Sequence, residues 1–292
     1  MKRFRWALSA AIVAAAGMGL AWIAYRAYAP GSLSDRIARA QQRWSVFGEP
    51  TTWSFLGRGL GITAQLAAIS VILSLTLAVP LALARLSRHP RLRAPFPGAG
   101  GTARVIGLLV ETVRSSPLFM LIIYTFIAAP KVGLDLTPFW AGVSALTLYT
   151  SCVTSEIVRA GILSLERGQF EAAEALGLGY VDRLRFVVLP QALRRMVPAI
   201  VSQLVTLIKD TSLVSFITVV ELARRGQILE QTANNPIETS LVLMAMYFVV
   251  NFALSEISRR LELRPGRAGR ARPPASIGTE DQIPAVVEPT RP

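Results

Sequence analysis

The sequence predicts an all-α membrane protein with about six transmembrane helices. Hydrophobic residues make up 52% of the 292 positions and the mean hydropathy is +0.45, which is too apolar for a soluble domain of this size. A helix needs about 20 mostly apolar residues to cross a bilayer. Six stretches meet this need: Ala7–Ala24, Leu60–Ala84, Val105–Ala129, Phe139–Ile162, Pro198–Val220 and Thr239–Ile257.

The first apolar stretch has two interpretations. Basic residues precede a short apolar core, and Ala27–Ala29 follows it, a pattern that resembles a signal peptide with its cleavage site. Pro30 stands directly after that site and argues against cleavage. We therefore predict an uncleaved membrane anchor over residues 1–29, with a signal peptide as the alternative.

The distribution of basic residues sets the expected orientation. If the N-terminus is cytoplasmic, 21 of the 31 Lys and Arg residues fall on the inner side and eight on the outer side. Cytoplasmic loops of membrane proteins carry this excess of positive charge. We expect both termini in the cytoplasm of a bacterium, with the chain in the inner membrane. The same excess accounts for the basic pI without any nucleic-acid partner.

The chain divides into four parts, and the anchor at residues 1–29 is the first. Residues 30–55 form a predicted periplasmic segment, and residues 56–261 form the transmembrane domain, which includes a cytoplasmic loop at 163–197. Residues 262–292 are rich in Arg, Pro and Gly, cannot bury a core, and are predicted to be disordered. The Arg cluster at the start of this tail is expected to touch anionic membrane lipid.

The residue inventory argues against chemistry within the chain. One cysteine, Cys152, and one histidine, His89, leave no basis for an internal disulfide or a metal site. None of the three lysines follows a Gly-x-x-x-x-Gly pattern, so there is no Walker A loop for ATP. We predict no catalytic residue, no metal ligand and no cofactor held by this chain.

The cytoplasmic loop 163–197 is predicted to contain two short helices. Strong helix formers favour a helix over Gly168–Leu176, and Gly177 supplies its stop. A second helix is expected over Tyr180–Val188, with Pro190 ending it. The loop therefore predicts two helices at an angle.

Small side chains in the first of these helices, Ala172 and Ala173, would let a partner surface approach closely. On residue types alone, an ordinary amphipathic loop at the membrane interface explains this segment equally well.

The fifth span, expected to begin at Pro198, carries charged and polar residues at membrane depth. Its sequence at 209–212 reads Lys-Asp-Thr-Ser. A Lys or Asp at the bilayer centre costs about 2.5–3.5 kcal/mol, so such residues face protein or water. Helical spacing joins the polar positions into one stripe: Ser202, Gln203, Thr206, Lys209 and Asp210.

This stripe has two possible roles. It could line a translocation path, or it could form a buried Lys–Asp pair or hold two copies of the chain together. Asp210, Thr211 and Ser212 are also good capping residues. A helix break at this point would present a helix N-terminus, whose positive end suits a carboxylate.

The loop residues carry a family resemblance. Glu-Ala-Ala, three residues, Gly, nine residues and Val-x-Leu-Pro resemble the EAA motif of importer-type ABC transporter permeases. The matching positions are Glu171, Ala172, Ala173, Gly177, Val187, Leu189 and Pro190. The resemblance implies that these residues couple the chain to an ATP-hydrolysing subunit.

A wider resemblance covers residues 56–261 and points to the polar amino-acid branch of these permeases, whose members carry His, Glu, Gln, Arg or opines. The similar segments are Leu-Gly-Ile-Thr-Ala-Gln-Leu (60–66), Glu-Ile-Val-Arg-Ala-Gly-Ile (156–162), Leu-Pro-Gln-Ala-Leu-Arg (189–194) and Lys-Asp-Thr-Ser-Leu-Val-Ser (209–215). Ser115 and Ser116 depart from the Gly-Thr that the branch commonly has before Pro-Leu. The resemblance implies a five-helix permease core, with the first span as an added anchor.

The resemblance also implies the partners. ATP-binding cassette ATPase subunits would hold ATP and magnesium, a second permease copy or a paralogue would complete the path, and a periplasmic solute-binding protein would deliver a polar amino acid. Residues Gln203, Thr206, Lys209, Asp210, Thr211 and Ser212 would line the translocation path. The rival class is an ion-coupled secondary transporter, which calls for internal repeats and a relay of membrane carboxylates. A membrane scaffold or sensor is a third class, and it would leave the loop and the stripe unexplained.

Overall fold

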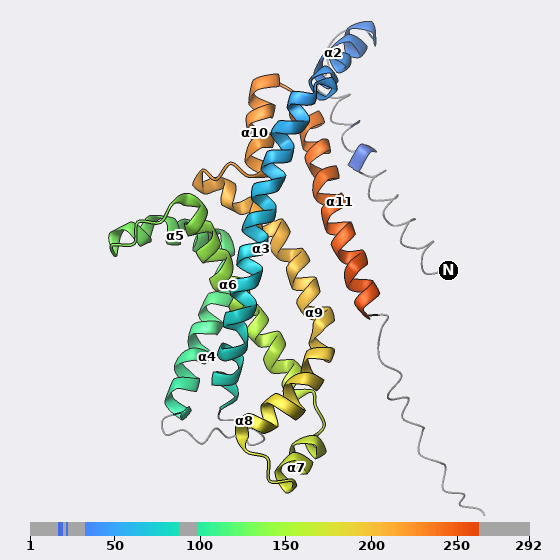
Figure 1. Ribbon diagram of the computed structural model, residues 1–292. Helices are drawn as coiled ribbons and strands as arrows, with labels where there is room; N and C mark the ends of the chain where they lie inside the picture. The colour runs from blue at the N-terminus through green and yellow to red at the C-terminus, as the bar shows by residue number, and fades with distance from the viewer. Residues whose placement is uncertain (1–16, 20–21, 23–32, 88–98, 263–292) are drawn as a thin grey trace, which may run out of the picture.

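The computed structural model describes residues 17–19, 22, 33–87 and 99–262. Most of the predicted anchor, His89 and the tail from residue 263 therefore lie outside the described residues. The described part is built from helices joined by short connections (Figure 1). The helices are α2 (Leu33–Ser45), α3 (Pro50–Leu86), α4 (Ala99–Ser115), α5 (Leu118–Lys131), α6 (Pro138–Leu163), α7 (Arg167–Ala175), α8 (Tyr180–Asp182), α9 (Leu189–Asp210), α10 (Leu222–Ala233) and α11 (Pro236–Glu262).

Three of the connections between the α-helices are themselves helical but differ from an α-helix in their turns. Short 3-10 helices cover η1 (Val46–Gly48) and η4 (Thr211–Ile217), and a π-helical turn covers η3 (Arg183–Val188). The all-α fold class is confirmed.

Within the described ranges, three helical segments are long and apolar enough to cross a membrane: α3, the continuous run Tyr180–Ile217 and Pro236–Glu256 of α11. A fourth arises if α4 and α5 count as one span, bent by 108°. The predicted span Val105–Ala129 is therefore divided between two helices rather than formed by one continuous helix. Pro117 lacks a backbone N–H and restricts the residue before it, so α4 ends at Ser115 and a new helix follows.

Helix α6 is the centre of the bundle. It spans 26 residues over the predicted range but is not among the helices that pass as apolar spans. It packs against α3, α4, α5, α9 and η4, so protein rather than lipid surrounds much of its surface. A polar series is buried there: Thr147, Thr150, Ser151, Thr154 and Ser155.

Two glycines of α6 allow its neighbours to approach closely. A Cβ added at Gly142 would lie 2.4 Å from Cγ1 of Val214 in η4, and one at Gly161 would lie 2.4 Å from Cγ of Met196 in α9. These separations are far below van der Waals contact. Small residues at helix contacts are the usual means by which membrane helices pack backbone to backbone.

A buried carboxylate ties the helices together at the end of the bundle away from α7. Glu221 is fully buried before α10 and accepts hydrogen bonds from Thr63 of α3 (3.1 Å) and Tyr247 of α11 (3.0 Å). Its other oxygen accepts from the backbone N–H of Arg224 (2.9 Å) and so caps α10. Three helices therefore share one side chain as an anchor.

The two prolines of the fifth span do not act as predicted. Pro190 does not end the preceding helix, because the helical run continues from η3 into α9 and Pro190 lies in the first turn of α9. The π-helical turn directly before it widens the backbone, which relieves the clash of the proline ring with the preceding turn. Pro198 lies inside α9 rather than at its start.

The close contact at Gly142 generates a stability prediction. Gly142→Ala should force η4 away from α6 and destabilise the fold by about 1–3 kcal/mol, because Val214 is branched and cannot turn aside. Gly57→Ala is the matched control, since an added Cβ there meets nothing within 4 Å. Thermal unfolding in detergent should show a lower transition temperature for Gly142→Ala alone. Equal transition temperatures would contradict this account of the contact.

Candidate coupling loop and translocation face

Helix α7 is followed by Gly177, whose backbone adopts a conformation that other residues rarely reach. Gly177 has a φ of +73°, in the region that costs glycine nothing. Its N–H donates to the carbonyl of Glu174 (2.9 Å), and the N–H of Leu178 donates to the carbonyl of Ala173 (3.1 Å). This is a Schellman cap, and the predicted stop at Gly177 is confirmed.

After this cap the chain reverses into α8 and η3 and then continues into α9 without a break. Two short helical segments are therefore present as predicted, but the second, Tyr180–Val188, leads directly into α9 rather than forming a separate element. Leu189 is half-buried and Pro190 exposed, both in the first turn of α9. Motion of the loop would reach α9 directly through this continuous backbone.

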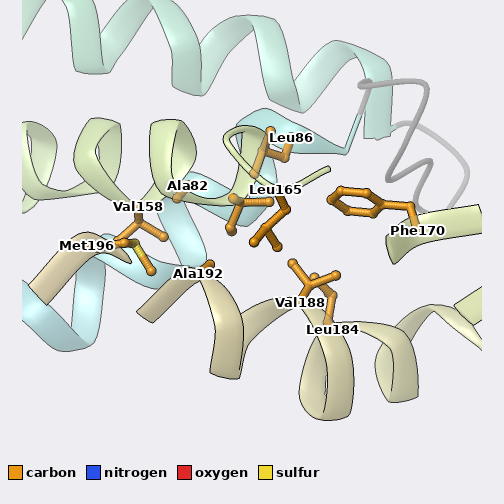
Figure 2. Close-up of a cluster of buried hydrophobic side chains, with 10 residues drawn as sticks. Ala82, Leu86, Val158, Leu165, Phe170, Leu184, Val188, Ala192 and Met196 are labelled. Atoms are coloured by element: carbon orange, nitrogen blue, oxygen red, sulfur yellow. The ribbon is translucent and has the colours of Figure 1, made fainter. Parts of the chain in front are cut away.

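A hydrophobic cluster fastens the loop to the bundle (Figure 2). Phe170 of α7 and Leu184 and Val188 of η3 pack towards the ends of three long helices. Those helices contribute Ala82, Leu86, Val158, Ile162, Ala192 and Met196, and the turn after α6 contributes Leu165. We call these ten residues the elbow core; it holds α7 and η3 as one body with α3, α6 and α9.

The predicted coupling residues divide between the elbow core and the surface. Ala173 is 2% exposed and packs inward, so the prediction that both alanines face a partner was wrong for this one. Its small size serves the packing of α7 on the bundle. Ala172 and Glu171 are exposed, and Glu171 pairs with Arg167 across one helical turn at 2.7 Å.

Sequence reasoning missed three exposed apolar residues on the loop. Leu176 is 79% exposed, Val181 66% and Phe186 63%. These three side chains do not belong to the elbow core. A large apolar residue on the loop that the core does not use is the signal that could have identified them. Each of these three side chains is available for contact with a partner surface.

An ion cluster lies where the loop joins the bundle. Glu156 of α6 accepts hydrogen bonds from Arg85 of α3 through one oxygen and from Arg159 through the other. The side chains of Arg85 and Glu156 are only 15% and 23% exposed. Glu156 and Arg159 are three residues apart on one helix, a spacing that allows such a pair, whereas the link to α3 follows from no local spacing.

Part of the polar stripe of α9 is exposed. Ser202, Thr206 and Lys209 are exposed, while Gln203 and Asp210 are half-buried beside them. Among the described residues Lys209 forms no ion pair. The described part of the chain therefore shows no buried Lys–Asp ion pair.

A helix break at Asp210, the condition for a helix N-terminus at that point, is not seen in the described residues. The chain tightens into η4, and the hydroxyls of Thr211 and Ser212 donate to carbonyls of the preceding turn, Ile208 and Lys209, both at 2.7 Å. Hydroxyls bonded in this way continue a helix instead of capping a new one. No free helix N-terminus faces a ligand here. Thr211 is fully buried and does not share the exposed face, and Ser212 is half-buried.

These features define a class of protein before any comparison. Long apolar helices, one with an exposed polar face, and a helical loop fixed to their ends describe a membrane transport subunit. Residues 101–266 match the family described as the binding-protein-dependent transport system inner membrane component. The chain belongs to this family and is a permease subunit of an ABC importer.

Relatives of known designation agree with this assignment. The chain is 42% identical over 214 residues to the probable glutamine ABC transporter permease protein GlnP of Bacillus subtilis, covering 72% of this chain and 94% of the relative. It is 34% identical over 234 residues to the glutamate transport system permease protein GluD of Corynebacterium glutamicum, covering 79% and 82%. The prediction of a transport subunit rather than an enzyme is confirmed by these relatives.

Solved structures share the fold. An amino acid ABC transporter crystallised with histidines gives a TM-score of 0.65 at 27% identity, covering 73% of this chain and 94% of that one. The MetNI methionine ABC transporter in an inward-facing conformation gives 0.58 at 23% identity, covering 73% and 98%, which supports the fold alone. Inner-membrane location and dependence on a binding protein follow from the family.

The ion cluster generates a prediction about stability. A double-mutant cycle of Arg85→Ala and Glu156→Ala should yield a coupling of about 0.5–3 kcal/mol, because both groups are largely shielded from water. The control cycle, Arg167→Ala with Glu171→Ala, removes a pair whose side chains are 77% and 61% exposed and should yield at most about 0.5 kcal/mol. Denaturant unfolding in detergent micelles measures both. Equal couplings would mean that Glu156 does not brace α3 against α6.

Proposed function

We propose that this permease carries polar amino acids or close relatives such as opines. The relatives that support the substrate class are named for glutamine, glutamate, arginine, cystine and octopine transport. Their aligned regions cover 71–79% of this chain. All of these solutes carry a carboxylate and an amino group on one carbon, so a single arrangement of polar groups serves them all.

The observation that carries the proposal is the exposed polar face of α9. Lys209 lies in a helix that is long and apolar enough to cross the membrane, and it forms no ion pair among the described residues. An ammonium in that position is costly against lipid and favourable against water or an anionic solute. Thr206 and Ser202 continue the face along the helix. Lys209 would meet the carboxylate of the solute, and Asp210 beside it would meet the amino group.

A second permease would complete the path. A single copy leaves the α9 face open, and an ammonium open to lipid is unfavourable. A second copy or a paralogue facing α9 would enclose the polar groups in a shared aqueous route. The rival role for the stripe, polar contacts that only lock two copies together, uses the same surface and is separated from transport by the experiment below.

Energy would come from separate ATPase subunits that hold ATP and magnesium. In the proposed topology α7 and both termini are cytoplasmic, and the solute-binding protein delivers its cargo at the opposite end of the bundle. Leu176, Val181 and Phe186 would seat in the ATPase, with Ala172 allowing close approach. The elbow core would transmit the motion of nucleotide binding and hydrolysis to α3, α6 and α9.

Alanine substitution at the α9 face tests the path. In vesicles holding the assembled importer, Lys209→Ala and Asp210→Ala should each lower ATP-driven uptake of a polar amino acid by at least tenfold, because binding in the path loses a charged partner. Lys131→Ala, at an exposed position at the end of α5, is the control and should transport normally. Competition by a panel of amino acids gives the substrate class. Normal uptake by assembled Lys209→Ala and Asp210→Ala proteins would leave only the locking role.

A charge on the loop tests coupling. Val181→Asp should abolish co-purification of the ATPase subunits, because an apolar docking surface cannot bury an unpaired carboxylate. Leu134→Asp is the matched control, since Leu134 is 57% exposed in the turn after α5. Subunit composition and ATP hydrolysis of the purified complex are the measurements. Retention of the ATPase by Val181→Asp would contradict the proposed docking surface.

A further inference from the structure

One flank of α11 is apolar and uncovered by the other described helices. Met244 is 53% exposed, Phe248 53%, Val249 64% and Phe252 54%. Three of them, at 244, 248 and 252, follow one another at helical spacing and form a single ridge. The rings of Phe248 and Phe252 stack with their centroids 5.7 Å apart, which makes the ridge broad and rigid. Helix α11 lies at the edge of the bundle (Figure 1).

A described fragment of the N-terminal stretch lies against this ridge. Residues 17–19 are helical, and a Cβ added at Gly17 would lie 3.7 Å from Cε of Met244. That separation is ordinary van der Waals contact. Gly17 therefore meets α11 on its open flank.

The sequence around Gly17 is patterned for such a contact. Small residues recur at alternating spacings of three and four along the whole predicted span, and they include Gly17 itself: Ala7, Ala10, Ala14, Gly17, Ala21 and Ala24. This spacing places them on one face of a helix. A continuous face of small residues is what allows a membrane helix to approach a neighbour closely.

We propose that the span Ala7–Ala24 is retained in the mature protein and packs its small-residue face against the Met244–Phe252 ridge of α11 in the same chain. Large side chains on α11 fill the groove that the alanines and Gly17 leave, which gains the dispersion contacts that drive helix association in lipid.

The proposed topology makes the first and last spans antiparallel. With Gly17 opposite Met244, the register then brings Ala14 to Phe248 and Ala10 to Phe252. The N-terminal span would add a further membrane helix at the edge of the subunit, beside α11.

Cysteine cross-linking of the full chain in membranes tests this packing. In a Cys152→Ala background, which removes the chain's one cysteine, the pairs Gly17→Cys with Met244→Cys and Ala14→Cys with Phe248→Cys should be joined by a short bis-methanethiosulfonate reagent. Ala15→Cys with Phe248→Cys is the control, because residue 15 points away from the small-residue face at nearly the same depth. We expect at least fivefold more cross-link in the first two pairs, all at the mass of one chain.

Three results would overturn the proposal. Equal cross-linking in the control pair would show that the small-residue face is not the side that meets α11. A product at the mass of two chains would show that the ridge packs against another copy of the chain. A mature protein that lacks residues 1–24, read by mass spectrometry, would show cleavage of the segment.

A second comparison uses only the 17–244 cysteine pair and leaves Phe248 unchanged. Ala14→Leu should reduce cross-linking of the 17–244 pair several-fold, because the bulk separates the helices, whereas Ala15→Leu should leave it unchanged. Equal effects of the two leucines would also reject the proposed face.

Discussion

The elbow core is the interaction on which the rest of the structure depends. A loop of two short helices has too little surface to stay folded alone, and Phe170, Leu184 and Val188 supply what it lacks by packing on the ends of α3, α6 and α9. Because the core is closely packed, the loop cannot shift without carrying those helix ends with it. The continuous backbone from η3 into α9 and the Arg85–Glu156–Arg159 cluster extend the same constraint. A force on the loop is thereby a force on the bundle.

The distribution of polarity follows from which surfaces meet lipid. Helix α6 buries a series of threonines and serines at the centre of the bundle, where neighbouring helices rather than lipid surround them. Helix α9 instead presents its polar face outward, and this exposure would be unfavourable for a subunit working alone. The flank of α11 is apolar and broad. The three helices thus face three different environments: the protein interior, the proposed path and the proposed N-terminal helix.

Much of this arrangement could be predicted from the sequence, because apolar length, the spacing of the Glu-Ala-Ala motif and a helix-ending glycine act locally. The predictions failed where tertiary packing decides. Pro117 bends one predicted span into α4 and α5, Pro190 lies within continuous helix because a π-helical turn accommodates it, and Ala173 faces inward. The link from Glu156 to Arg85 joins residues 71 positions apart, which no local pattern reveals. The stripe on α9 was predicted from periodicity, whereas the inward position of Thr211 depends on the turn into η4.

The central claim is that nucleotide-driven motion enters this chain through its loop from another protein. Vesicles reconstituted with the permease, its ATPase and its binding protein should accumulate a polar amino acid when ATP is supplied on the loop side. Vesicles holding the permease alone should accumulate none, whether a proton or a sodium gradient is imposed. Accumulation by the permease alone on either gradient would contradict the claim.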